Sequence, residues 1–162
     1  MNLKSRWSPC RGVTVDRVAQ ELGRWTVSCT LRPSGRCPDC GLKSRRCHGW
    51  RSRRLRDLAS HGDLVELHVR LCRWRCEQLS CARRTFSDDE ALLARPYSHH
   101  TKRAAQIIGL LGHSAGGRPA EKILHRLGLR VSDDTILRQL LRLTDGGEEP
   151  ARVIGIPLAT GG

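Results

Sequence analysis

The sequence lacks any apolar run long enough to cross a membrane or to form the core of a secretory signal. Its opening residues, MNLKSRWSPC, carry charge in place of such a core. It also has no lipidation motif, no internal repeat, no low-complexity segment and no amphipathic helix with a broad side for lipid. These absences argue against a membrane as partner, and we expect a cytoplasmic protein.

Acidic residues are few relative to basic ones. The 162-residue chain has 16 Asp plus Glu against 29 Lys plus Arg, which gives a formal net charge of +13. The excess comes largely from arginine, whose planar guanidinium suits phosphate and guanine. Nucleic acid is therefore the favoured polyanionic partner. At this length the chain has room for one ordinary domain or two small ones.

Eight cysteines in a cytoplasmic chain indicate metal ligands or free thiols rather than disulfides. Four of them form two pairs, Cys37-x2-Cys40 and Cys76-x4-Cys81, with 35 residues between the pairs. Paired thiolates at this spacing are typical of a closed tetrahedral zinc site, which stabilises a fold and leaves no open position for catalysis. The alternative is four unrelated reduced thiols.

The remaining cysteines are weaker candidates for ligands. Cys47, His48 and Cys72 are substitutes for one of the four, but adjacent residues such as Cys47 and His48 bind one ion poorly. Cys72 is expected to pack within a strand. Cys10 and Cys29 have no informative spacing and are assigned as buried or free thiols.

Alternation of apolar and polar residues predicts β-structure in the first half of the chain. Residues 65–71 alternate strictly, and the phase flips at Leu71–Cys72, which predicts a β-bulge or a twist there. Two weakly apolar stretches, 13–22 and 25–31, are compatible with a hairpin. A helix over residues 15–22 is nearly as good an interpretation.

Beyond residue 96 the apolar period becomes helical. The preceding stretch, 85–96, is predicted to be a linker with one helical turn. Two stripes follow at i, i+3, i+4 and i+7 spacing, and Gly116-Gly117 separates them. Ser132 is placed to cap a third helix with two acids in its first turn. The residues expected to be buried in that helix are Ile136, Leu137, Leu140 and Leu141.

Arginines crowd the segment between the cysteine pairs and flank the second pair, beside Trp50 and Trp74. On a zinc module such a surface favours phosphate contacts over a merely solvated face. The candidate DNA-contacting residues of this region are Arg45, Arg46, Arg51, Arg53, Arg54, Arg73, Arg75, Arg83 and Arg84.

The last two helices and the turn Gly128–Val131 match the helix-turn-helix plan, in which the second helix enters the major groove. An ordinary three-helix bundle is the alternative. On the polar stripe of that second helix, Arg138 suits guanine and Gln139 suits adenine. Phosphate or thymine-methyl contacts are expected from Ser132, Thr135 and Arg142.

Taken together, these residues resemble the ISL-three-type insertion-sequence transposases over roughly residues 36–156. The resemblance is carried by Cys37-Pro38-Asp39-Cys40-Gly41, Arg56-Asp57-Leu58, residues 65–74, 76–86, 118–143 and 152–156. It implies a zinc ribbon and a helix-turn-helix that bind terminal inverted repeats. A ribonuclease-H-like catalytic domain with two aspartates and a glutamate would follow them.

The end of the sequence departs from that family pattern. Residues 153–156 resemble the first strand of the catalytic domain, after which the first metal-binding aspartate is expected. The sequence instead continues from Pro157 to Gly162 without a carboxylate, although two-metal phosphoryl transfer requires several. We therefore expect a transposase fragment truncated before its catalytic domain, with no enzymatic activity of its own.

The predicted fold class is α+β: a small zinc-ribbon β module followed by an all-α helix-turn-helix bundle. The expected divisions are an N-terminal extension with a candidate hairpin (1–35), the zinc ribbon (36–88), the helix-turn-helix (97–145), and a linker with a truncated catalytic strand (146–162). Structural Zn²⁺ is the expected cofactor. Double-stranded DNA of the nucleoid is the expected partner, and a homodimer or a full-length transposase is a further candidate. A stand-alone regulator and an RNA-associated zinc ribbon are the competing functions.

Overall fold

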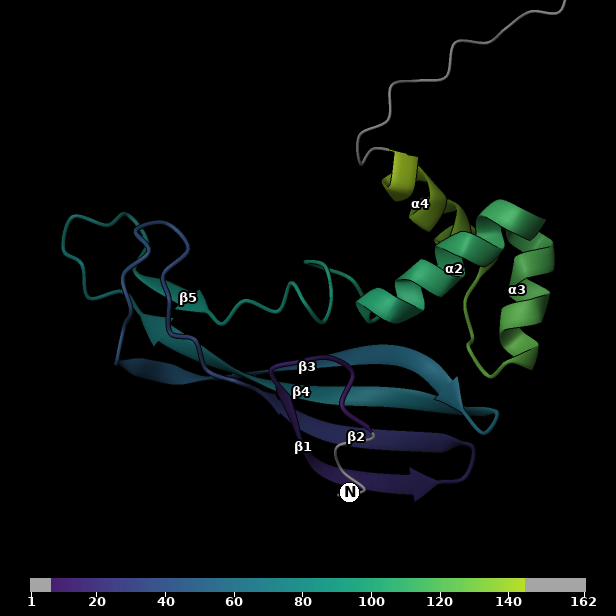
Figure 1. Ribbon diagram of the computed structural model, residues 1–162, viewed down its shortest axis with the longest axis horizontal. Coiled ribbons are helices and arrows are strands. Elements are labelled where there is room, and N and C mark those ends of the chain that lie inside the picture. The colour runs from purple at the N-terminus through teal and green to yellow at the C-terminus, as the bar shows by residue number, and fades with distance from the viewer. Residues whose placement is uncertain (1–6, 145–162) are drawn as a thin grey trace, which may run out of the picture.

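The computed structural model describes residues 7–144, and its architecture is α+β, as predicted. One five-stranded sheet has the order β1-β2-β4-β3, and β5 pairs with β4. Three helices gather near one end of the long strands, while β5 lies towards the opposite end (Figure 1). The strands are β1 (Val13–Glu21), β2 (Arg24–Leu31), β3 (Cys47–Ser60), β4 (Asp63–Arg75) and β5 (Thr85–Ser87), and the helices are α2 (Lys102–Ala115), α3 (Gly117–Arg126) and α4 (Asp133–Thr144).

None of these helices is long and apolar enough to span a bilayer, a statement that covers the described residues alone. The linker and truncated catalytic strand expected at 146–162 lie outside those residues.

The N-terminal hairpin is confirmed, and the alternative helix over residues 15–22 is wrong. β1 and β2 pair antiparallel from Val13↔Leu31 to Glu21↔Arg24 around a tight turn in which Gly23 has a positive φ of 69°. β2 then runs parallel to β4, with Val27 opposite Leu67. The hairpin therefore belongs to the same sheet as the cysteine-bearing strand, because its alternating apolar side chains complete that sheet's core.

Sequence reasoning missed β3, the longest strand at 14 residues. Only Leu55 and Asp57 within it are buried, so its apolar alternation is too short to stand out among the arginines. Its conformation comes instead from pairing with β4, which extends from Cys47↔Trp74 to Ser60↔Asp63. Cross-strand hydrogen bonding thus overrides a weak local pattern.

The phase flip at Leu71–Cys72 is real, but no bulge lies there. Both residues are buried, at 1% and 2% exposed, and their pairing with β3 is unbroken. The register shift lies in β3 instead, between Cys47 and Gly49. The flip marks the place where β4 changes neighbours, because β2 pairs up to Arg70 and β5 begins opposite Arg73.

Most of the sheet's core lies on one face and is covered by residues that were predicted to be a linker. Leu93 and Ala94 are 2% and 0% exposed and pack with Val27, Leu55 and Leu67. Earlier in the same stretch, Thr85–Ser87 forms β5. The predicted helical turn is present at 90–94, where the Ala94 amide donates to the Glu90 carbonyl at 2.9 Å. The linker prediction was wrong because it rested on the composition of this stretch, which does not reveal the apolar face that the stretch covers.

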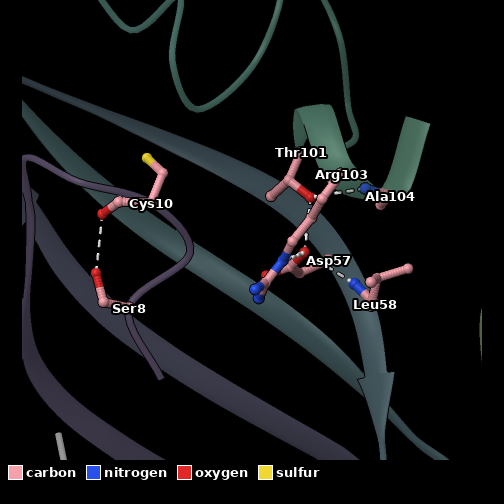
Figure 2. A network of polar contacts seen from close by, with 7 residues as sticks. All are labelled: Ser8, Cys10, Asp57, Leu58, Thr101, Arg103 and Ala104. Atoms are coloured by element: carbon pink, nitrogen blue, oxygen red, sulfur yellow. Dashed lines mark hydrogen bonds and ion pairs between the residues drawn. The ribbon is translucent and has the colours of Figure 1, made fainter. Parts of the chain in front are cut away.

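A buried carboxylate joins the sheet to the helices. Asp57 on β3 is fully buried and accepts hydrogen bonds from the Thr101 hydroxyl at 2.6 Å and from Arg103 Nε at 2.8 Å (Figure 2). The backbone amide of Leu58 also donates to it, at 2.9 Å. Thr101 in turn caps α2, since its side chain accepts from the Ala104 amide. This network fixes where α2 begins relative to β3.

The three predicted helices are present, and the turn between α3 and α4 is well defined. Gly128 has a φ of 82°, and the Leu129 amide donates to the Leu124 carbonyl at 2.8 Å, which is the pattern of a Schellman cap. A side chain at Gly128 would meet the Gly62 carbonyl oxygen at 2.3 Å. The α3–α4 turn therefore sits directly on the β3–β4 turn.

Burial of the third helix follows the prediction only in part. Ile136 is fully buried, and the Ser132 hydroxyl accepts from the Thr135 amide at 3.4 Å, as expected of a cap. Leu137 and Leu141 were expected to be buried, but they are 49% and 65% exposed. The bundle is small, so α2 and α3 cover only one narrow side of α4.

Candidate metal centre and basic surface

The first cysteine pair lies in a tight loop whose amides turn inward. The Cys37 amide donates to the Leu42 carbonyl at 2.9 Å, and the Gly41 amide donates to the Cys37 carbonyl at 2.9 Å. Gly41 has a φ of 71°, a conformation that glycine adopts without the steric cost of a Cβ. The glycine after Cys40 is thus required by the loop that presents the two sulfur atoms.

The second pair follows β4 directly. The Cys76 amide donates to the Arg84 carbonyl at 2.9 Å, and the Cys81 amide donates to the Gln78 carbonyl at 3.2 Å. Because Arg75 on β4 pairs with Thr85 on β5, the two ends of this loop are fixed by the sheet. A rigid element thus positions the second pair of thiols.

The four predicted ligands converge. All four Sγ atoms lie within 4.8 Å of one another, with Cys37 and Cys81 at 4.0 Å and Cys40 and Cys76 at 3.7 Å. A tetrahedral zinc ion with Zn–S bonds of about 2.3 Å requires sulfur atoms about 3.8 Å apart. The cluster has that size and that donor set. It is the one such ligand group within residues 7–144.

The ionisation of these thiols also favours a cation. The Cys40 backbone amide, by hydrogen bonding to the Cys37 sulfur, lowers the pKa of Cys37 to about 7. The Gln78 amide acts in the same direction on Cys76, but burial and the neighbouring thiols prevail and raise the pKa of Cys76 to about 12. Four sulfur atoms this close cannot all become thiolates unless a positive ion compensates their charge.

Aromatic packing and a buried carboxylate support the cluster. Phe86 is 5% exposed and packs on the cysteines together with Trp74. The indole Nε1 of Trp74 donates to Asp88 at 2.9 Å, and the amides of Ser34 and Gly35 donate to the same oxygen. Trp74 is therefore part of the packing. Sequence reasoning missed Asp88, which nothing in its local pattern distinguishes from a solvated acid.

Residues 33–85 match the zinc finger of transposase IS204/IS1001/IS1096/IS1165. The match includes all four clustered cysteines and covers about a third of the chain. It confirms the predicted transposase zinc ribbon and, with the geometry of the cluster, the structural zinc site. No curated protein and no solved structure matches the chain.

The other four cysteines lie outside the metal site of the transposase zinc ribbon. Cys10 and Cys29 pack in the core of the large sheet. Cys47 is exposed and its Sγ lies 3.2 Å from that of buried Cys72, across β3 and β4. Burial raises the pKa of Cys29 to about 12. Their placement agrees with the prediction, which left these four cysteines out of the ligand set.

Most arginines predicted to contact DNA are exposed on or near the transposase zinc ribbon. Two have side-chain partners, since Arg83 pairs with Asp39 at 2.9 Å and Arg73 donates to Thr85 at 3.0 Å. The following have exposed side chains with no ion pair or hydrogen bond to any described residue: Arg45, Arg46, Arg51, Arg54, Arg75 and Arg84.

Arg53 does not lie on that surface. Its side chain is only 10% exposed, forms an ion pair with Glu90, and donates to the carbonyls of Arg95 at 3.0 Å and Ser98 at 2.5 Å. Its side chain lies on the opposite face of β3 from those of its two sequence neighbours, and there it holds the 90–98 segment over the sheet. The prediction treated the arginine run as one surface and so ignored the strand's two faces.

The polar stripe of α4 borders a cleft against the sheet. Thr135, Arg138, Gln139 and Arg142 all line a cleft shared with β3 and residues 97–100. Arg138 and Arg142 remain exposed, and Arg138 pairs with Asp134 one turn earlier. Gln139 is only 8% exposed, so it does not lie on the open surface from which it was expected to reach a base. Sequence reasoning missed the cleft, because its two sides are far apart in the chain.

Proposed function

We propose that this chain is the DNA-binding part of a transposase and recognises terminal inverted repeats through its zinc ribbon and its α3–α4 helix pair. The observation that carries the proposal is the matched transposase zinc ribbon, whose four sulfur atoms fit one structural zinc ion. In this proposal the chain carries no strand-transfer chemistry.

The zinc ribbon supplies phosphate contacts in this proposal. Its unpaired guanidiniums protrude from a module that the metal and the β4–β5 pairing make rigid. Rigid placement matters because a preordered cation loses less side-chain and backbone entropy when it meets a phosphate. Each such contact releases a counterion, so binding should weaken steeply as salt rises.

Base contacts come from the first half of α4. Ser132 directly precedes α4 and Thr135 and Arg138 lie in its first two turns, the part of a recognition helix that approaches base edges. Arg138 is the best candidate to read guanine, since its side chain is 64% exposed and its single partner, Asp134, is equally exposed. Gln139 is left out of the interface because it is buried, and Arg53 because its side chain is only 10% exposed and is paired with Glu90.

The test compares a duplex bearing the element's terminal repeat with a scrambled duplex of equal length, by fluorescence anisotropy over a range of salt concentrations. Arg75→Ala combined with Arg84→Ala should weaken both duplexes equally and reduce the salt slope by about 2. Arg138→Ala should weaken the repeat alone, by about 10-fold or more. Arg11→Ala combined with Arg17→Ala removes two exposed arginines outside the ribbon and is the control of equal charge.

Two outcomes would overturn the proposal. Equal affinity of the unmodified chain for repeat and scrambled duplexes would remove specific recognition. An effect of the Arg11/Arg17 double variant as large as that of the ribbon variant would show that the charge total, and not the ribbon, governs binding.

A further inference from the structure

The cleft between α4 and β3 differs from the exposed zinc-ribbon surface in shape and in chemistry. It has a volume of about 590 Å³ and opens between the polar stripe of α4 and the outer face of the sheet. The residues that matter here are Arg54, Arg56, Tyr97, His100 and Arg142.

The charge of the cleft is strongly positive and poorly compensated. Arg54 and Arg142 have no side-chain partner among the described residues. Arg56 donates only to the backbone carbonyl of Arg130, at 3.1 Å. One acid lines the cleft, Glu66, and its carboxylate already accepts from His68 at 2.6 Å. Several guanidiniums held together without matching acids attract an anion with more than one charge.

An exposed aromatic ring stands at the same cleft. Tyr97 is 96% exposed, so its ring contributes almost nothing to the protein's own packing. Its backbone has a φ of 58°, in the left-handed region that a bulky side chain rarely occupies. Such a conformation costs free energy and is found preferentially at functional sites. The fold thus holds an aromatic ring out beside the arginines.

An unsatisfied buried nitrogen points to a ligand as well. His100 is 6% exposed, and its Nε2 is buried without a hydrogen-bond partner in the described part of the chain. His100 also lines the cleft, next to Arg56, with which it forms an isolated bridge. Buried polar atoms are rarely left unpaired in a native structure unless water or a ligand satisfies them.

The shape of the cleft decides which nucleic acid fits it. A duplex is read by an element that protrudes into its groove, whereas this site is a recess between α4 and β3. One strand can enter such a recess, because its backbone follows a basic groove while its bases stack on aromatic rings. We propose that this cleft binds an unpaired nucleic-acid strand, with Tyr97 stacking on a base and with Arg54 and Arg142 contacting its phosphates.

The outer face of β3 extends the same path. Trp50 lies on the same face of β3 as Arg54. The two residues are four positions apart, which is about 14 Å along a strand. It is 48% exposed, and the guanidinium of Arg70 lies 4.0 Å from its ring centroid. A second aromatic platform beside a cation therefore lies about two nucleotides from the cleft.

The inference goes beyond duplex recognition, and it is tested on the full chain with zinc bound. The probes are fluorescein-labelled oligo-dT and oligo-rU of ten nucleotides, followed by anisotropy. Tyr97→Ala should weaken binding about 10-fold through lost stacking, while Tyr97→Phe keeps the ring and should bind as the unmodified chain does. Arg142→Ala should lower the salt slope by about 0.7. Arg126→Ala, on the exposed side of α3, is the control of equal charge.

Direct placement comes from photocrosslinking an oligo-dT that carries 5-iodouracil, followed by mass spectrometry. A crosslink at Tyr97 supports the inference, and binding of dT or of rU identifies which strand the cleft accepts. Crosslinks confined to the zinc ribbon, or equal losses for Tyr97→Ala and Arg126→Ala, would overturn it. Tyr97→Ala leaves the ribbon arginines and Arg138 intact, and the Arg75/Arg84 variant leaves the cleft intact, so either proposal can fail while the other stands.

Discussion

Serine in place of Cys76 should weaken zinc binding far more than serine in place of Cys47. Both residues are thiols near the ends of long strands, but Cys76 belongs to the four-sulfur cluster, whereas Cys47 lies outside it, beside Cys72. Structural zinc sites in peptides contribute roughly 10–16 kcal/mol. A quarter of that, about 3 kcal/mol, is the expected loss when one of four thiolates is removed, which corresponds to a zinc affinity lower by about 100-fold.

The consequence for folding should be local. Phe86 and Trp74 pack on the cysteines, whereas the larger core packs Val27, Leu55 and Leu67 farther along the sheet. Removing the ion should therefore release the two cysteine loops before the large sheet unfolds. The amides of Cys37, Cys76 and Cys81, whose hydrogen bonds close those loops, should lose protection first.

Zinc affinity is measured by competition with a chromophoric chelator, and protection by hydrogen exchange with mass spectrometry. Peptides spanning 35–46 and 76–84 should exchange rapidly after chelation, while peptides within 63–71 should stay protected. The reasoning is refuted if the purified, reduced chain binds no zinc, if C47S loses as much affinity as C76S, or if chelation leaves exchange in both cysteine loops unchanged.

Two further predictions concern the contacts that hold the helices to the sheet. A double-mutant cycle of Asp57→Asn with Arg103→Gln, followed by urea unfolding, should give a coupling free energy of about 1–2 kcal/mol. The coupling is expected to be moderate because the carboxylate is fully buried while Arg103 is 45% exposed and partly screened. Additive effects of the two substitutions would contradict this prediction. His100 has a pKa lowered to about 4 by burial, with Arg56 and His99 adding to the effect, against 6.5 as the ordinary value. Its stabilising contribution is therefore complete above pH 6.5 and is lost as pH falls towards 4, about 2 kcal/mol by pH 5. The pH dependence of the free energy of unfolding should shrink by that amount in H100Q, and an unchanged profile would contradict the prediction.

The metal site was predictable from sequence because its chemistry is local. Cys37 and Cys40 need only one turn to bring their sulfur atoms together, and Gly41 permits that turn. Cys76 and Cys81 need only a strand end and a loop. The one long-range requirement is that the two loops meet, and zinc's preference for four sulfur ligands supplies the reason.

The strand β3 and the covering segment at 88–94 were not predictable in the same way. Arg53 and Arg54 are indistinguishable in sequence, yet one is buried against Glu90 and the other is exposed, because a strand sends consecutive side chains to opposite faces. Without the pairing of β3 to β4, no pattern says that a strand is present. Leu93 covers the core for the same reason: its partners come from β2, β3 and β4.

The cleft shows most clearly why site chemistry escapes a reading of local pattern. The helical period of α4 correctly indicated a polar stripe, and a polar stripe is expected to face water. It borders a cleft against β3 instead, since Asp57 binds Thr101 and Arg103 at the start of α2 and Gly128 seats the α3–α4 turn on Gly62. Those contacts join residues that are 44 or more positions apart. The arginine-bearing surfaces of α4 and of β3 thereby form one basic cleft. The proposed affinity of the cleft for an anion comes from the proximity of these two surfaces.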